Sequence, residues 1–397
     1  MKKLMIAAAT LSLSAPVFAG LYGDTPDAKH AWSVHDMNRP NPVKVAPAVQ
    51  PGQAPSDAIV LFDGTAESFA RNWRDGKGNP SQWKLGTEGD FYCVPGWKNG
   101  GAIFTRGEFG DCQLHIEYRH DAELGLVPKH GAQMHGNSGV FLMNNYEIQV
   151  LESYGTNPAD MKNPNYADGQ AGAVYAENPP QVNPARKPGE WQVYDIVFHQ
   201  PKWDGKTLVE PGSVTVFFNG VLVQDHWEME GLTTHCRRRP LAPHPTKGPL
   251  QLQDHGCVVH YRNIWIREIP PRWANTTHSV KYGKTEDVMA LRRDTAAKLL
   301  AKIDQTQCGA AQVNQAYEVL AYSKDEPYLG ACRKIFAGYL ATLNAMDDKA
   351  LDAAKGDILS IKRSIDVLRR NKVIGTCALC TKICDVIAKK GWDKKKK

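Results

Sequence analysis

The stretch SGVFLMNNYEIQVL (residues 138–151) has the pattern of a β-hairpin. Two runs rich in apolar, aromatic and β-branched residues flank Asn144-Asn145. Asparagine is one of the few residues that tolerate the positive φ of a two-residue hairpin turn. The pattern therefore predicts two antiparallel strands joined at Asn144-Asn145.

The predicted turn also assigns residues to the two faces of the hairpin. Side chains alternate across a strand, so Glu147 and Gln149 share one face and Ile148 and Val150 share the other. We expect Phe141 to join Ile148 and Val150 in a core, and Glu147 and Gln149 to lie on the open face. The expected cross-strand pairs are Leu142 with Glu147, Phe141 with Ile148, and Val140 with Gln149.

Short alternating runs bounded by Gly, Asn or Pro extend from residue 58 to about residue 270. Helical periodicity is nearly absent in this range, and Asn219-Gly220 marks a second hairpin turn. We expect a mainly β domain over residues 58–270, a jelly-roll β-sandwich of two mostly antiparallel sheets. Examples of the runs are CQLHIEYRH (112–120), WQVYDIVFHQ (191–200), SVTVFFNGVLVQDH (213–226) and HYRNIWIREI (260–269).

The pattern changes after residue 284, where apolar residues recur at helical spacing in segments such as YLGACRKIFAGYLATL (328–343). This predicts a small all-α domain over residues 284–392, followed by a basic tail, 393–397. No paired carboxylates or histidines share a face there, so its expected role is packing or contact with a protein partner. Residues 20–57 are rich in proline and have no apolar period, which predicts a strap or linker.

The first 19 residues have the features of a cleavable signal peptide: two lysines, an apolar run and a small-residue cleavage site ending at Ala19. We expect a periplasmic or secreted protein without a transmembrane segment. Most of the formal net charge of +6 lies in this leader and in the lysine-rich tail, so the body is nearly neutral. A nearly neutral body argues against nucleic-acid binding.

Nine cysteines follow the predicted cleavage site. In an oxidising compartment we expect structural disulfides, with one thiol left over because the number is odd. Cys377, Cys380 and Cys384 cluster at helical spacing. A single CxxC without a second one or a histidine pair is a weak indication of a metal site.

The residues Glu147, Gln149 and Glu152 resemble the Glu-x-Asp-x-x-Glu strand of laminarinase-type retaining glucanases. In those enzymes two glutamates act as nucleophile and acid about 5 to 5.5 Å apart. Here the amide Gln149 replaces the central aspartate, and this departs from the pattern of an ordinary glucan hydrolase. Glu152 also has the wrong parity to share a face with Glu147, unless a β-bulge near Leu151 resets it.

Five segments resemble, in their order and spacing, a bacterial family of 3-keto-disaccharide hydrolase domains. The fold of that family is similar to that of concanavalin A-like lectins and glucanases. The resemblance covers about residues 30–269 and leaves out the helical region. The segments are LFDGTAESFARNW (61–73), GNSGVFLMNNYEIQVLESYG (136–155), PGEWQVYDIVFHQPKWDG (188–205), VTVFFNGVLVQDH (214–226) and GPLQLQDHGCVVHYRNIWIREI (248–269).

The resemblance implies cleavage of 3-keto-glycosides by elimination and hydration, which requires an acid, a base and donors for an enolate oxygen. Glu147 and Glu152 are candidates for base and acid, and Asp254 and His255 for polarising the carbonyl or holding a divalent cation. The expected substrate-binding residues carry amide, guanidinium or aromatic groups; they are Gln149, Asn137, Arg119, Tyr154, Trp191 and Gln253.

Two other functions are compatible with the sequence. A lectin-like module would bind carbohydrate without an acid/base pair, and a conventional retaining glucanase would cleave unoxidised sugars. No cofactor is certain, and the use of a divalent cation is left open. Arg237-Arg238-Arg239, before Pro240, predict a solvated loop.

Overall fold

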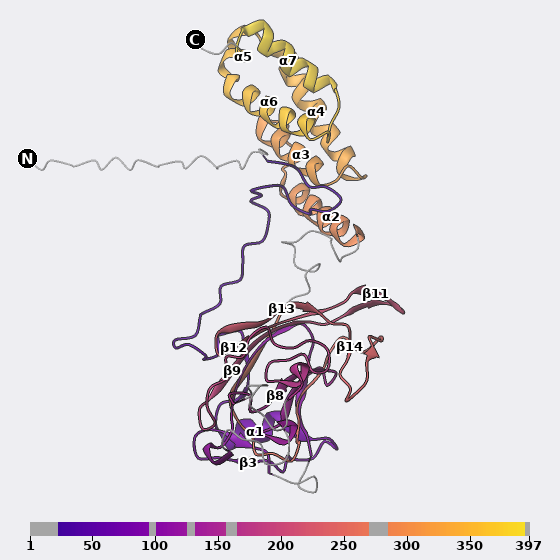
Figure 1. The fold of residues 1–397 in the computed structure, drawn as a ribbon. Coiled ribbons are helices and arrows are strands. Elements are labelled where there is room, and N and C mark those ends of the chain that lie inside the picture. The colour runs from indigo at the N-terminus through magenta and orange to yellow at the C-terminus, as the bar shows by residue number, and fades with distance from the viewer. Residues whose placement is uncertain (1–22, 95–100, 125–131, 156–164, 270–284, 394–397) are drawn as a thin grey trace, which may run out of the picture. The chain divides into compact units, whose positions relative to one another are not determined.

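Two units make up the chain, and the computed structural model describes residues 23–94, 101–124, 132–155, 165–269 and 285–393 (Figure 1). One unit spans residues 43–271. The other combines residues 1–42 with residues 272–397. The predicted signal peptide and residues 394–397 of the predicted tail lie outside the described residues.

The unit of residues 43–271 is a sandwich of two antiparallel sheets, which in the described residues have eight and five strands. In order across the larger sheet lie β13 (Val221–Glu228), β12 (Ser213–Phe218), β9 (Gln192–His199), β6 (Cys112–Arg119), β17 (His260–Glu268), β4 (Phe91–Tyr92) and β3 (Lys84–Leu85), and β1 (Ile59–Phe62) also pairs with β17. The smaller sheet contains β2 (Trp73–Asp75), β5 (Ile103–Phe109), β16 (Gly248–Leu252), β7 (Ser138–Leu142) and β8 (Tyr146–Val150). This confirms the predicted jelly-roll sandwich.

Shorter elements complete the sandwich. Helix α1 begins after Thr65, whose side-chain oxygen accepts a hydrogen bond from the Ser68 backbone N–H at 3.1 Å. The other elements are α1 (Ala66–Asn72), the hairpins β10 (Lys202–Asp204) with β11 (Thr207–Glu210) and β14 (Gly231–Leu232) with β15 (Arg239–Pro240), and the 3-10 turns η1 (Ala122–Leu124), η2 (Ala132–Met134) and η3 (Ala167–Gly169).

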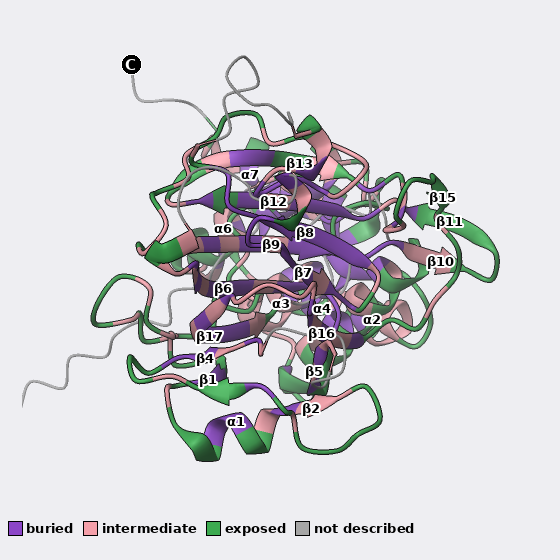
Figure 2. Ribbon diagram, turned by 60° about the horizontal axis from the view of Figure 1, so that its bottom comes forward, coloured by how far each residue is buried: buried purple, intermediate pink, exposed green. Residues whose placement is uncertain are grey.

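One apolar core fills the space between the two sheets. Tyr146 of β8 packs against Phe198 of β9, and Trp73 of β2 packs against Phe91 of β4, each pair with ring centroids 5.5 Å apart. Figure 2 shows the buried colour along β6, β9, β12, β7 and β8. Because the core lies between the sheets, side chains on the far face of either sheet are available for another use.

The β7–β8 hairpin forms where the sequence predicts it, but its register is shifted by one residue. Phe141 pairs with Glu147, and Gly139 pairs with Gln149. Phe141 therefore shares the face of Glu147, and its predicted place in the core was wrong. The core face of the two strands is formed by Val140, Leu142, Ile148 and Val150.

The turn of this hairpin explains the shift. Met143 and Asn144 have φ values of 53° and 58°, and the Asn145 backbone N–H donates to the Leu142 carbonyl at 3.0 Å. The left-handed residues are thus Met143 and Asn144 rather than Asn144 and Asn145. Three residues separate the paired positions Leu142 and Tyr146.

The second unit is all α-helical in its C-terminal part, as predicted. Its helices pack around a separate apolar core. Gly391 ends the last helix with φ 63°, a left-handed cap conformation that glycine adopts easily. The described helices are α2 (Thr285–Lys302), α3 (Ala310–Tyr322), α4 (Tyr328–Ala345), α5 (Asp348–Ala353), α6 (Lys355–Arg370) and α7 (Ala378–Lys390).

The predicted strap divides between the two units at residue 42. Its first part packs on the helices: Trp32 contacts the helical core, and Asn38 donates to Glu318 at 2.6 Å. Its second part lies on the sandwich, where the Gly52 carbonyl accepts hydrogen bonds from Asn263 and Trp265, both at 2.8 Å. The strap is therefore built into both units.

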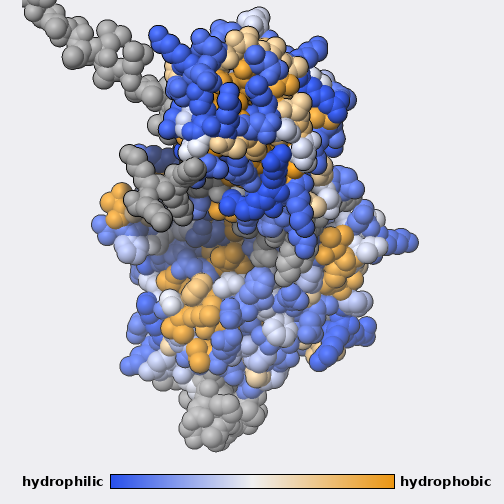
Figure 3. Space-filling model, turned by 90° about the horizontal axis from the view of Figure 1, so that it is seen from above, coloured by the Kyte–Doolittle hydropathy of each residue, from blue (hydrophilic) through white to orange (hydrophobic). Residues whose placement is uncertain are grey.

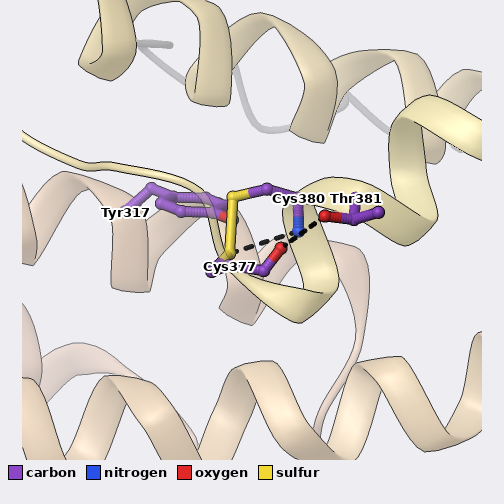
Figure 4. The surroundings of a disulfide bond; sticks show 4 residues. All are labelled: Tyr317, Cys377, Cys380 and Thr381. Atoms are coloured by element: carbon purple, nitrogen blue, oxygen red, sulfur yellow. Dashed lines mark hydrogen bonds between the residues drawn. A yellow bond between two sulfur atoms is a disulfide. The ribbon is translucent and has the colours of Figure 1, made fainter.

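Cys377 and Cys380 are placed as a disulfide pair at the start of α7 (Figure 4). Cys377 caps the helix, because its sulfur accepts a hydrogen bond from the Cys380 backbone N–H at 3.2 Å. Among the described residues the other seven cysteines have free thiols. The further structural disulfides that we expected are thus not present in this structure.

On the face seen in Figure 3, hydrophilic residues cover most of the molecule and hydrophobic residues form separate patches. None of the described helices combines the length and the apolar character needed to cross a membrane.

Candidate active site

The far face of the five-stranded sheet collects polar side chains from neighbouring strands. Glu147 and Gln149 project from β8 on this face, because the residues between them belong to the core. Gln253 follows β16 and continues the pairing with β7, since its backbone N–H donates to the Gly139 carbonyl at 3.0 Å. Strand alternation therefore brings Glu147, Gln149 and Gln253 together, as the sequence suggests.

Glu147 is a buried carboxyl without a partner. Its side chain is 3% exposed, and no described residue donates a hydrogen bond to its carboxylate or forms an ion pair with it. Burial raises the pKa of Glu147 from 4.5 to about 8. A carboxyl with this pKa keeps its proton at neutral pH and can donate it.

Gly139 makes the room for this carboxyl. A Cβ atom at residue 139 would lie 2.3 Å from the Glu147 Oε1 and 2.9 Å from the Phe141 ring. Atoms cannot approach so closely, so any larger residue would displace the carboxyl or the ring. The packing of Glu147 and Phe141 therefore requires a glycine at position 139.

Amide groups surround Gln149, which is 1% exposed. Gln149 donates to the Gln133 side-chain oxygen at 3.3 Å, and Asn137 donates to the same oxygen at 3.2 Å. Gln133 in turn donates to Asn165 at 2.6 Å and to the Gly169 carbonyl at 2.9 Å. This network ties β8 to two loops and fixes the orientation of the predicted residues Gln149 and Asn137.

A chain of hydrogen bonds reaches this face from two other segments. Tyr166 and Tyr175 join through their hydroxyl groups at 3.1 Å, and the Tyr175 hydroxyl bonds to the Nδ1 of His235 at 2.9 Å. The Nε2 of His235 lies 3.1 Å from the sulfur of Cys236. Burial raises the pKa of Tyr175, and the charges of Tyr166 and Glu147 add to the shift, so the chain lies within electrostatic reach of Glu147.

Asp254 and His255 lie where the chain leaves β16. Burial lowers the pKa of His255 below its usual 6.5, and His235 lowers it further, against the opposing effect of Asp254. His255 is therefore neutral at pH 7 and able to accept a proton. Asp254 is 5% exposed, and its carboxylate accepts a hydrogen bond from the Gly256 backbone N–H at 2.8 Å.

Glu152 follows β8, whose pairing with β7 has no register shift up to Val150. It belongs to the opposite side of the strand, where its Oε2 lies 3.4 Å from the Nδ1 of His120. The His120 ring packs edge-on against Tyr118 of the core, with centroids 5.6 Å apart. Glu152 and His120 are 3% and 1% exposed. The structure thus places the Glu152 carboxyl beside the His120 ring, on the buried side of the strand.

Three predicted sugar-contacting residues also lie elsewhere. Arg119 and Trp191 stack together, 5.2 Å from guanidinium to ring, and Arg262 lies 4.0 Å from the same ring. Arg119 follows the core residue Tyr118 on β6, so it points away from the core on the outer face of the larger sheet. Tyr154 contacts Glu152 and Lys187 instead of the Glu147 group.

Several residues of the site are not predicted by any of the sequence patterns. Gln133, Tyr166, Tyr175 and His235 come from loops without periodicity, and only the fold brings them to β8. The role of Gly139 could have been predicted, because a glycine inside a strand pattern often marks a place where another group approaches the backbone closely. Among the described residues, no group of three or more His, Cys, Asp or Glu side chains is arranged to hold a metal ion.

The family match and a similar solved structure show that the sandwich is a carbohydrate-processing domain. The chain belongs to the family of 3-keto-alpha-glucoside-1,2-lyase-like domains, whose model matches residues 57–267, more than half of the sequence. This agrees with the resemblance found in the sequence, and the helical region lies outside the match.

Solved structures similar to this chain were also found. A candidate glycosyl hydrolase from Parabacteroides distasonis is 36% identical, with 62% of this chain and all of that chain covered and a TM-score of 0.52. A second candidate glycosyl hydrolase from that organism is 18% identical, with 57% of this chain and all of that chain covered and a TM-score of 0.37. The β-glucanase of Bacillus licheniformis is 10% identical, with 55% and 100% covered and a TM-score of 0.26. A comparison with curated proteins gave no match.

Proposed function

We propose that the sandwich cleaves 3-keto-glycosides between the sugar C1 and the leaving-group oxygen, by elimination followed by addition of water. The observation that carries the proposal is the buried, unpaired carboxyl of Glu147, whose pKa of about 8 keeps it protonated at neutral pH. Membership of the 3-keto-alpha-glucoside-1,2-lyase-like family supports the choice of substrate.

The chemistry requires two proton transfers. A ketone at C3 makes the C2 hydrogen acidic, so a base can remove it and leave an enolate. The enolate expels the oxygen substituent from C1 and forms a C1–C2 double bond, while an acid protonates the departing oxygen. Water then adds across this double bond, with its hydroxyl at C1 and a proton at C2, and gives the free 3-keto-sugar.

Glu147 and His255 fit the two roles because burial shifts their pKa values in opposite senses. The raised pKa of Glu147 makes it the acid for the leaving oxygen. The lowered pKa of His255 makes it the base for the C2 proton. Gln149 and Asn137, held by Gln133, are placed to bind sugar hydroxyls. The separation of Glu152 from Glu147 counts against double displacement by two carboxylates, the mechanism of a retaining glucanase.

The test is a comparison of a 3-keto-disaccharide with its unoxidised parent. Cleavage of the oxidised sugar alone supports the proposal. Cleavage of both sugars would favour a glucanase, and binding without cleavage of either would favour a lectin-like module.

Glu147→Gln should lower kcat on the oxidised sugar by a factor of about 100 or more, the range for loss of general acid catalysis. The matched control is Glu190→Gln, which changes an exposed glutamate of the same unit. Unchanged turnover in the Glu147 variant would remove that residue from the mechanism.

We also propose that the protein acts outside the cytoplasm, on the evidence of the leader-like residues 1–19. Fractionation of cells that express the full chain tests this. Recovery of an unprocessed chain in the cytoplasmic fraction would contradict it.

A further inference from the structure

A cavity of about 270 Å³ adjoins the Glu147 face at the edge of the five-stranded sheet. Its volume lies near the small end of ligand pockets, about 300–1,000 Å³, and suits one ring-sized group. We call it the arginine cavity. It is lined by Tyr175, Glu177, Glu230, Thr233 and Arg237–Arg239, among others.

Two lining residues connect this cavity directly to the candidate site. The side-chain oxygen of Thr233 accepts a hydrogen bond from the Glu147 backbone N–H at 2.9 Å. The Tyr175 backbone N–H donates to the Glu147 carbonyl at 3.1 Å, and the Tyr175 ring lies within electrostatic reach of the Glu147 carboxyl. The lining of the cavity is therefore hydrogen-bonded to Glu147 on the edge strand β8.

The cavity has an excess of positive charge that the protein does not neutralise. Arg237, Arg238 and Arg239 are exposed, and among the described residues no carboxylate pairs with them and no group accepts a hydrogen bond from them. The Glu177 carboxylate is already occupied, since it accepts hydrogen bonds from Trp227 at 2.8 Å and from the Glu230 backbone N–H at 2.5 Å.

We propose that the arginine cavity binds the leaving group of the substrate and selects one that carries an anionic group. This inference rests on the proposed function and names its substrate class: 3-keto-glycosides whose aglycone bears a carboxylate, sulfate or phosphate. Guanidinium groups match these anions because their planar N–H donors can bond to two oxygens at once. The unpaired arginines therefore favour an anionic group, which the reacting sugar itself does not carry.

The test compares two 3-keto-glucosides that differ only in the aglycone, 4-carboxyphenyl and its neutral methyl ester. Wild-type enzyme should have a KM about tenfold lower for the carboxylate, as expected for two exposed ion pairs of up to about fivefold each. The same preference should appear in the Kd of the two unoxidised glucosides, which bind without reacting.

Variants of the cavity should move this preference in both directions. Arg237→Gln with Arg238→Gln should abolish it, whereas Glu230→Gln should increase it, because a repelling carboxylate is removed. Arg106→Gln is the matched control, since Arg106 is an exposed arginine of β5 outside the cavity lining. A urea unfolding curve for each variant confirms that it is folded.

The binding measurement separates the two proposals. If neither 3-keto-glucoside is cleaved, the proposed function fails, and the Kd values still decide the present inference. Equal Kd values for the carboxylate and the ester in the wild type would overturn it, and so would a preference that survives in the double arginine variant.

Discussion

The stability of the Glu147→Gln variant relative to the wild type should increase as the pH rises. The pKa of Glu147 is 4.5 in an unfolded chain and about 8 in the fold, so the folded state holds its proton more tightly. Its contribution to stability is therefore greatest below pH 4.5 and is lost as the pH rises towards 8. At 1.36 kcal/mol per pKa unit, the loss is about 3 kcal/mol at pH 7 and about 5 kcal/mol above pH 9.

Glutamine removes this loss because it does not ionise. Its amide is as unpaired as the acid was, which costs about 1–3 kcal/mol at every pH. The prediction concerns the slope: the difference in unfolding free energy between variant and wild type should grow by about 1.4 kcal/mol per pH unit between pH 5 and 8.

Urea unfolding of both proteins between pH 5 and 9, followed by tryptophan fluorescence, measures this difference. All other titrating groups are common to the two proteins and cancel. Glu190→Gln, at an exposed position, is the matched control. A difference between Glu147→Gln and wild type that does not change with pH would refute the buried, unpaired carboxyl on which the site rests.

Three further predictions concern neighbouring features. Gly139→Ala should abolish most turnover and lower the free energy of unfolding by about 1–3 kcal/mol, because its Cβ would meet the Glu147 carboxyl; a normal kcat would contradict this. The pH profile of kcat/KM should fall on the acid side as His255 gains a proton, with a midpoint below the usual 6.5 of histidine, and on the basic side above about pH 8 as Glu147 loses one; a profile that stays flat to pH 9 would exclude Glu147 as the acid. Trp191→Ala should lower stability by about 1–2 kcal/mol through the lost arginine stacking and leave KM unchanged, whereas a raised KM would return Trp191 to the sugar site.

The fold could be predicted from the sequence because its information is local. Alternation in β8 placed Glu147 and Gln149 opposite Ile148 and Val150 without reference to any other strand. The cross-strand register depended on the turn, and there the prediction failed by one residue. Met143 takes a left-handed conformation beside Asn144, a position that propensity does not assign to methionine.

The predicted part of the site lies on strands or directly beside them. Glu147, Gln149 and Gln253 follow from alternation, whereas Arg119 and Trp191 were chosen for their chemistry and lie on the larger sheet. The parity argument places Glu152 on the side opposite Glu147, and in the structure it lies beside His120. Loop residues such as Gln133 reach the site through tertiary hydrogen bonds, and these have no counterpart in local sequence patterns.

The N-terminal strap can complete its contacts only after the helical unit has been synthesised. Residues 43–271 contain every strand of the sandwich and can fold as soon as they are synthesised. Asp36 and Asn38 bond to Tyr322 and Glu318 of α3, which are added almost 300 residues later. One of the first described segments of the chain is thus among the last to find its partners, and until then Trp32 lacks the helical core that it contacts in the fold.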